Sequence, residues 1–439
     1  MNSASKITFP DTPKARRHVS PLAIGIWGMV VLFVIYQFVL RVSLGVMAPS
    51  LMERFVIDAT QFSLLGSLFY FGYASMQIPV GILLDRFGPL RIVPIFVLLC
   101  VAGFCLFTFS NNWALALFGR FITGIGSAGA FISSLKVTHL LFPERLFKFL
   151  VGLTSSLGLL GAICGGLIGI LLTIYSLSDV LQGLSGLGIV FLFAILSLFY
   201  QKKSKALLKS QETPMEETEQ SILAGLKVIF KKPSLLILIF CTALMTMALY
   251  TFADSWGPSF LMQYHHLSMD QASFSIFLIY IGMTIGATLL SFIGERFNIT
   301  QLIVATSGFI TAVILFGFLA ISHIPYYSIL YCMFIFGMCA SLQILVFGLI
   351  LSQIPKRFGG IITGLTNMTI MLLGSGSISL AGFLMDFSND KIIQNGTPIY
   401  GQSAYTLSFG CIAILVLIGA IGFSIVSITG HFKQKKSHG

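Results

Sequence analysis

The chain has 439 residues, of which 56% are hydrophobic and only 9% are charged, and its mean hydropathy is +0.94. A soluble globular protein carries about 25% charged residues, so this composition excludes a soluble protein and indicates one that crosses a membrane many times. The net charge of +11 does not indicate nucleic-acid binding, because the basic residues are concentrated in the loops of one membrane face.

Twelve apolar stretches are long enough to be transmembrane helices, since a helix needs about 20 apolar residues to cross a bilayer. The basic segment before the first of them is not a signal peptide, so we expect the N-terminus to stay in the cytoplasm. The sequence therefore predicts an all-α polytopic membrane protein with spans at 22–49, 61–83, 92–110, 113–136, 147–172, 184–201, 234–262, 271–293, 300–321, 326–353, 359–385 and 404–429.

The stretches form two groups of six. We expect a bundle over 22–201 and a second bundle over 234–429, joined by a polar cytoplasmic linker over 202–233. Cytoplasmic tails over 1–21 and 430–439 complete the chain. In this arrangement 21 of the 26 Lys and Arg residues lie on the cytoplasmic side, as the positive-inside rule requires.

The two groups repeat each other at an offset of about 210 residues. Because each half has an even number of spans, both halves have the same orientation, which predicts a solute site at the membrane midplane between them. The matching pairs include PERLFKFLVGLT from Pro143 with PKRFGGIITGLT from Pro355, DRFG at Asp85 with ERFN at Glu295, Pro49 with Pro258, and Tyr70 with Tyr280.

Two motifs mark the first half. GILLDRFGPLR follows the second stretch, and RFITGIG begins at Arg120 in the fourth. With the span count, the repeat and the linker, they resemble the major facilitator superfamily. The runs YQFVLRVS, GRFITGIGSAGAFISSLK and LFPERLF resemble more narrowly the branch that contains the lysosomal dipeptide transporter and its bacterial relatives. This resemblance implies transport of amino acids, short peptides or similar organic solutes.

Two departures narrow that implication. The fifth stretch reads GLLGAICGGLIG and lacks the Gly-Pro pair typical of drug exporters, which favours uptake. The paired-glutamate signature of proton-coupled peptide transporters is also absent from the first stretch. Coupling to a proton and uniport therefore both stay open.

Three cations and one acid lie inside the expected spans, and a charge in the bilayer is costly unless it has a function or a partner. Arg41 and Asp254 lie at similar depth, one in each half, while Arg120 and Lys136 share the fourth span. An arginine binds a carboxylate through two parallel hydrogen bonds, and an aspartate accepts an amine. We therefore expect a site for a zwitterionic or anionic solute, extended by polar neighbours at helical spacing: Gln37, Tyr70, Tyr250 and Tyr280.

Structural alternatives remain for each charge. Arg41 and Asp254 can form an ion pair that only joins the halves. Arg120 can donate to backbone carbonyls of its own half, and Lys136 can extend towards the inner interface.

The resemblance also implies a gate at the cytoplasmic ends of the spans. Asp85 should meet the start of the eleventh span near Gly359, where a helix N-terminus favours a carboxylate. By the repeat, Glu295 should meet the start of the fifth span near Phe147. The expected gating residues are Gly81, Asp85, Arg86, Gly88, Glu295 and Arg296.

The sequence is thus interpreted as a monomeric secondary transporter in a bacterial inner membrane, working by alternating access, with a small-molecule solute and the lipid bilayer as its partners. No catalytic, metal, cofactor or nucleic-acid site is expected. The alternatives are an exporter of drugs or of a carboxylate siderophore, and a solute receptor of the same fold that does not transport.

Overall fold

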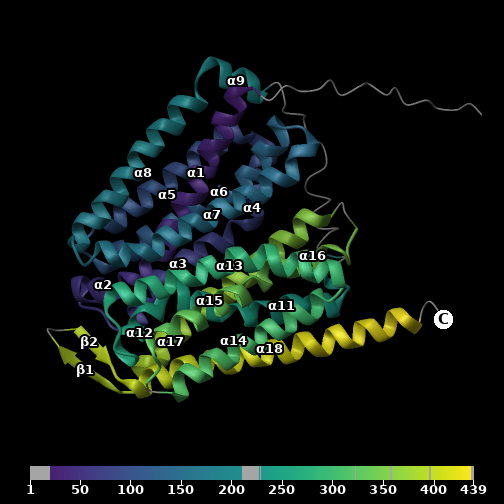
Figure 1. The fold of residues 1–439 in the computed structure, drawn as a ribbon. Helices are drawn as coiled ribbons and strands as arrows, with labels where there is room; N and C mark the ends of the chain where they lie inside the picture. The colour runs from purple at the N-terminus through teal and green to yellow at the C-terminus, as the bar shows by residue number, and fades with distance from the viewer. Residues whose placement is uncertain are drawn as a thin grey trace, which may run out of the picture.

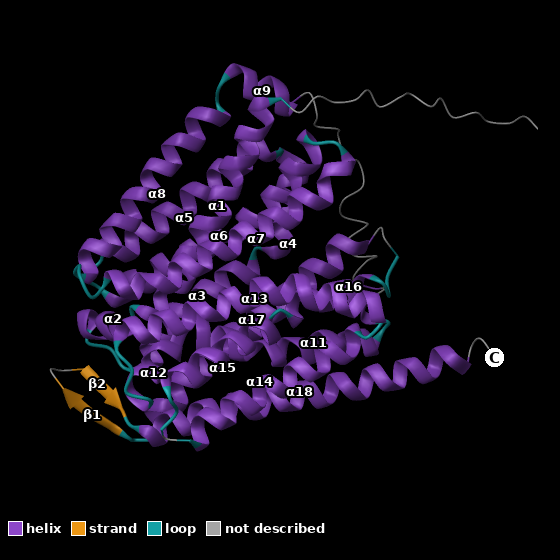
Figure 2. Ribbon diagram, in the orientation of Figure 1, coloured by secondary structure: helices purple, strands orange, loops and turns teal. Residues whose placement is uncertain are grey.

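The computed structural model describes residues 20–209, 227, 229–321, 323–355, 358–394 and 397–436. Most of the expected tail 1–21 and most of the expected linker 202–233 lie outside these residues. The described chain is almost entirely helical (Figure 2), which confirms the all-α membrane class.

The first half is a bundle of helices connected by short loops (Figure 1). Its elements are α1 (Pro21–Val46), α2 (Ala48–Phe55), α3 (Ala59–Ser75), α4 (Gln77–Phe87), α5 (Pro89–Phe109), α6 (Trp113–Leu141), α7 (Glu144–Leu171), α8 (Leu177–Phe199) and α9 (Lys202–Lys209).

The second half repeats this arrangement and adds a short β-hairpin. Its elements are α11 (Pro233–Ala248), the π-helix η1 (Leu249–Trp256), α12 (Gly257–Tyr264), α13 (Met269–Phe297), α14 (Thr300–Ala320), α15 (Tyr326–Ala340), α16 (Leu342–Leu351), α17 (Gly359–Phe387), β1 (Lys391–Gln394), β2 (Thr397–Tyr400) and α18 (Gln402–Lys436).

Within the described residues, eleven helical segments are long and apolar enough to cross a membrane. The second expected span is divided: α3 continues into α4 through Met76, whose backbone stays right-handed (φ −97°, ψ −2°). Because α2 is bent by 113° from α3, we assign α3 and α4 together as the twelfth span. Several helices extend beyond the predicted apolar stretches: α18, for example, continues seven residues further, to Lys436. Hydropathy detects only the part inside the bilayer.

Matching capping boxes begin the second span of each half. The Asp58 side chain accepts from the Gln61 N–H, and the Gln61 side chain accepts in turn from the Asp58 N–H. Ser268 and Gln271 form the same pair at the start of α13. Each box pairs backbone N–H groups that have no partner within the helix. The two repeat-related helices α3 and α13 thus begin with the same type of cap.

The hairpin was not predicted from the sequence. β1 and β2 pair antiparallel from Lys391 with Tyr400 to Gln394 with Thr397. The Asn-Gly dipeptide at 395–396 is a strong hairpin signal between two such segments, and it would have indicated this element.

We call the membrane end that carries the hairpin and residues 47–58 the hairpin end, and the end that carries α9 the linker end.

The two halves are joined at the hairpin end and diverge towards α9 and the end of α18 (Figure 1). The Trp256 indole donates to the Ser63 hydroxyl over 2.9 Å, and the Ser375 hydroxyl donates to the Ser67 carbonyl over 2.8 Å. Gly45 packs so closely on η1 that a Cβ there would lie 2.7 Å from the Ser255 carbonyl oxygen. Only glycine permits this approach, so the described structure is closed at the hairpin end.

Asp386 of α17 caps α3 from the opposite half. Its Oδ2 accepts from the Thr60 N–H at 2.8 Å and the Thr60 hydroxyl at 2.6 Å, and its Oδ1 accepts from the Tyr400 hydroxyl at 2.5 Å. Tyr400 also accepts from the Ala59 N–H at 2.8 Å. Burial and the neighbouring carboxylate raise the pKa of Tyr400 above its ordinary value, so the phenol stays a donor.

We expect Asp386→Asn to favour separation of the halves at the hairpin end. A charged cap is worth about 1 kcal/mol, or roughly fivefold in an equilibrium. Electron–electron distances should be measured between spin labels at the exposed positions Val56 and Ile392. In Asp386→Asn their distribution should include an additional population at longer distance. The control is Asp179→Asn, which removes a cap inside the first half and should leave the distances unchanged. An unaltered distribution in Asp386→Asn contradicts the expectation.

Candidate functional site

The candidate site is built around an ion pair that joins the two halves. Arg41 of α1 places Nη2 at 2.8 Å and Nε at 3.1 Å from Oδ2 of Asp254 in η1. Both side chains are buried, with relative exposures of 8% and 0%. The two charges that the sequence placed at similar depth therefore lie in direct contact.

Two tyrosines related by the internal repeat bind the same carboxylate. Tyr70 of α3 donates to Oδ2 of Asp254, and Tyr280 of α13 donates to Oδ1. Tyr70 also accepts from Nε of Arg41 at 2.7 Å. The carboxylate thus accepts four hydrogen bonds, one from Tyr280 of its own half and three from Arg41 and Tyr70 of the other.

The aspartate is positioned by a π-helix. Residues 249–256 depart from the α-helical repeat between α11 and α12, and such turns occur frequently at functional sites. The departure ends at Gly257 and Pro258, where α12 begins with proline in its first turn. Pro49 begins α2 after α1 in the same way. The sequence marks this break only through its repeated proline.

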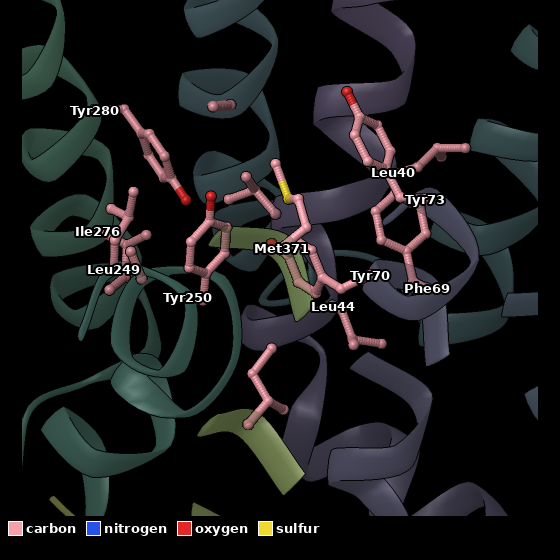
Figure 3. Close-up of a cluster of buried hydrophobic side chains, with 14 of the residues drawn as sticks. Leu40, Leu44, Phe69, Tyr70, Tyr73, Leu249, Tyr250, Ile276, Tyr280 and Met371 are labelled. Carbon is pink, nitrogen blue, oxygen red and sulfur yellow. The ribbon is translucent and has the colours of Figure 1, made fainter. Parts of the chain in front are cut away.

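Aromatic rings enclose the guanidinium of Arg41. Its Cζ lies 5.1 to 5.2 Å from the ring centroids of Phe38, Tyr70 and Tyr250, which is within cation–π range. Figure 3 shows Tyr70, Tyr250 and Tyr280 gathered between helices of both halves. We call Arg41, Tyr70, Tyr250, Asp254 and Tyr280 the Arg41 cluster.

The cluster has the donors of a carboxylate-binding site. Taking two charges out of water costs several kcal/mol per ion unless hydrogen bonds satisfy them. Here Arg41, Tyr70 and Tyr280 all converge on one carboxylate. The same donors can bind the carboxylate or sulfonate of another molecule if Asp254 withdraws or is neutralised.

Arg120 lies outside the Arg41 cluster. Its Nε donates to the Leu65 carbonyl at 3.2 Å, and its Nη1 donates to the Leu40 carbonyl at 3.1 Å. The guanidinium also lies over the rings of Phe69 and Phe107. These contacts join α6 to α1 and α3 within the first half, as in the structural alternative drawn from the sequence.

Lys136 also lies away from the cluster, near the linker end. Its Nζ is 2.7 Å from Oδ1 of Asp85 in α4, and both side chains are partly exposed. Among the described residues Asp85 forms its ion pair with Lys136 of its own half, and its contact with the start of α17 stays a prediction.

The remaining gating residues lie at the linker end. Gly88 ends α4 with φ 74°, which explains a glycine at this motif position. Glu295 and Arg296 are exposed, as is Arg86; Gly81 has open space beside its α-carbon. A contact of Glu295 with Phe147 stays a prediction.

We expect Asp85→Asn to slow transport more than it weakens solute binding. The change removes the partner of Lys136 far from the Arg41 cluster, and a partly exposed pair is worth up to about 1 kcal/mol, or roughly fivefold. Initial uptake rates and equilibrium binding should be compared in the same membranes. Asp179→Asn, an exposed acid of α8, is the matched control. Equal losses of rate and affinity would contradict a gating role.

Two polar side chains near the cluster were not expected from the sequence. Gln343 of α16 accepts from the Tyr250 hydroxyl at 3.3 Å, and Asn367 of α17 donates to Gln77 of α4 at 2.8 Å. Gln77 itself is indicated by the sequence, because its helical spacing from Tyr70 and Tyr73 puts all three residues on one face. Gln343 and Asn367 have no comparable pattern around them.

Among solved structures, the nucleoside transporter NupG matches with a TM-score of 0.71 at 14% identity, covering 93% of this chain and 99% of NupG. An inward-facing, unoccupied bacterial homolog of the human lysosomal transporter Spinster matches with a TM-score of 0.68 at 15% identity, covering 94% of this chain and 98% of that chain. At these identities the matches show a shared fold.

Three relatives match over shorter segments, which span 28%, 32% and 55% of their own lengths. They are the "Uncharacterized transporter YybO" of Bacillus subtilis (strain 168), 33% identical over 29% of this chain; the "Probable sulfoacetate transporter SauU" of Cupriavidus necator, 30% identical over 31%; and the "Hexuronate transporter" of Bacillus subtilis (strain 168), 28% identical over 53%.

The family model of the Major Facilitator Superfamily matches residues 26–379, which include most of α1, all of α2 to α16 and most of α17. This is well over half of the chain, and it agrees with the motifs, the internal repeat and the fold. The chain therefore belongs to the Major Facilitator Superfamily.

Proposed function

We propose that this transporter moves a small organic anion whose carboxylate or sulfonate binds Arg41, Tyr70 and Tyr280. The observation that carries the proposal is the convergence of these three donors on one buried carboxylate, that of Asp254. The names of two relatives support it, because hexuronate and sulfoacetate are both organic anions. The solute's anionic group would replace Asp254 on the guanidinium.

A zwitterion, such as an amino acid or short peptide, is the second candidate. Asp254 favours it, because a carboxylate freed from Arg41 accepts an amine. The resemblance to the branch of the lysosomal dipeptide transporter points the same way. The first candidate is better supported, since Asp254 already accepts four hydrogen bonds.

Transport would occur by alternating access, with 22–201 rocking against 234–429. The halves are joined at the hairpin end, and the positive-inside rule puts the linker end in the cytoplasm. The described structure is then inward-facing, in a monomer with both termini cytoplasmic in a bacterial inner membrane. We propose uptake, with Asp254 as the group that a coupling proton neutralises when the solute binds Arg41.

Solute counterflow in proteoliposomes tests this proposal. Vesicles loaded with unlabelled glucuronate, sulfoacetate, amino acids or dipeptides should accumulate the matching labelled solute, and Arg41→Lys vesicles should not. A receptor would bind the solute without counterflow. Counterflow that is unaffected by Arg41→Lys would show that the anion does not bind at this site.

A further inference from the structure

Four amide side chains lie on the linker-end side of the Arg41 cluster. α1 runs from the linker end to the hairpin end, so Gln37 lies one turn, or about 6 Å, on the linker side of Arg41. The two residues share one face of α1 because they are four positions apart. Gln37 is 1% exposed, so its amide is as buried as the charge beside it.

Two further amides lie beyond Gln37 in the direction of the linker end. α3 and α4 run towards the linker end, which places Gln77 about 10 Å on the linker side of Tyr70. Asn367 donates to Gln77 at 2.8 Å across the two halves. It precedes Gly374 by seven residues, and a Cβ at Gly374 would lie 2.7 Å from the Tyr250 ring. Both helices therefore lead from the cluster to this amide pair.

The hydrogen-bonding capacity of these amides exceeds the partners that the described residues supply. Oε1 of Gln37 and Nε2 of Gln77 are buried, and neither has a partner among the described residues. A buried amide atom without a partner is unfavourable, and it is tolerated where a bound molecule supplies the partner. Gln343 adds a half-buried amide that already contacts Tyr250 over 3.3 Å.

All four of these side chains are neutral. The nearest ion pair described towards the linker end, Lys136 with Asp85, is already satisfied within the first half. Neutral amides bind hydroxyl, carbonyl and amide groups, whereas an apolar tail would leave them unpaired.

We propose that Gln37 and Gln77 are specificity-determining residues that bind a neutral polar group of the solute about 6–10 Å from its anionic group. The substrate class is then an organic acid with a hydroxylated, carbonyl or amide-bearing tail. Acids with apolar tails are rejected because they leave the amides without partners. This inference rests on the proposed function, since it takes the anionic group to be bound at Arg41.

The test compares matched pairs of acids with polar and apolar tails. Suitable pairs are gluconate with hexanoate, glucuronate with cyclohexanecarboxylate, and N-acetylglycine with pentanoate. Binding to the full-length protein in nanodiscs is measured by calorimetry for wild type, Gln37→Leu, Gln77→Leu and the control Gln182→Leu. Gln182 is an exposed glutamine of α8 that contacts Ser178, so the control should match wild type.

Wild type should prefer the polar acid of at least one pair. Gln37→Leu should lower the affinity for that acid roughly 3- to 10-fold, as expected for the loss of one hydrogen bond. Binding of its apolar partner should stay the same or improve. The melting temperature of Gln37→Leu should not fall, because leucine removes an unpaired buried acceptor. A stable variant with a changed preference separates a binding role from a structural one.

Two results overturn the inference and leave the proposed function intact. One is wild type binding both acids of every pair equally through Arg41. The other is that Gln37→Leu and Gln77→Leu lower the affinity for both acids of a pair to the same extent, or change neither affinity. If wild type binds none of the acids, the proposed anion function itself fails.

Discussion

Arg41→Lys is expected to weaken solute binding by roughly 10- to 150-fold, the equivalent of one charge-assisted hydrogen bond of about 1.5–3 kcal/mol. Lysine keeps the charge and loses the planar fork. In the structure, Nε contacts both Tyr70 and Asp254 while Nη2 contacts Asp254. A single ammonium cannot reproduce both directions. Equilibrium binding to purified protein measures the loss.

Two other arginines supply the controls. Arg91→Lys changes an exposed arginine of α5 and should have no effect on binding or stability. Arg120→Lys removes donors to the Leu40 and Leu65 carbonyls, so it should lower the melting temperature with little change in affinity. Arg41→Lys should insert into the membrane and keep its fold. If Arg41→Lys binds the solute as tightly as wild type, Arg41 is a structural residue and the anion binds elsewhere.

Asp254→Asn is expected to have opposite effects on the two candidate classes of solute. An organic anion should bind more tightly, because it no longer displaces a carboxylate from Arg41. An amino acid or peptide should bind less tightly, because its amine loses a negative partner. Breaking one side of a buried pair costs about 3–5 kcal/mol, so the variant without solute should be less stable and an anion should restore its stability.

Uptake driven by a pH gradient should be lost in Asp254→Asn while counterflow persists, because a neutral amide cannot carry a proton. The control is the double variant Arg41→Met with Asp254→Leu, which replaces the pair by apolar side chains of similar volume. Such replacements are often neutral or stabilising, so it should fold and bind no anion. Unchanged affinity for both solute classes and unchanged uptake at every pH would count against both roles of Asp254.

The span pattern and the superfamily could be derived from the sequence because a bilayer leaves the backbone few choices. Every N–H and C=O in the hydrocarbon must be paired within the segment, so an apolar stretch of about 20 residues becomes a helix. The repeat is visible in the sequence itself, for example at Tyr70 and Tyr280. The capping boxes of α3 and α13 depend only on residues three positions apart. The depth of Arg41 and Asp254 also follows from residue counts along their helices.

Other features depended on contacts between segments far apart in the chain. Nothing near Arg120 in the sequence indicates that the Leu40 and Leu65 carbonyls will satisfy it. The pairing of Lys136 with Asp85 across 51 positions is equally non-local. The capping of α3 by Asp386 spans 326 positions, and only the packing of α17 on α3 brings the two together.

Local sequence was therefore enough to predict the membrane class, the apolar stretches, the repeat and the residues that carry charge into the bilayer. Which of those charges meet depends on how the helices pack, because a helix defines the face and depth of a side chain but not its neighbour. The π-helix at 249–256 turns Asp254 towards Arg41, and the two repeat-related tyrosines converge on it because the halves pack face to face at the hairpin end.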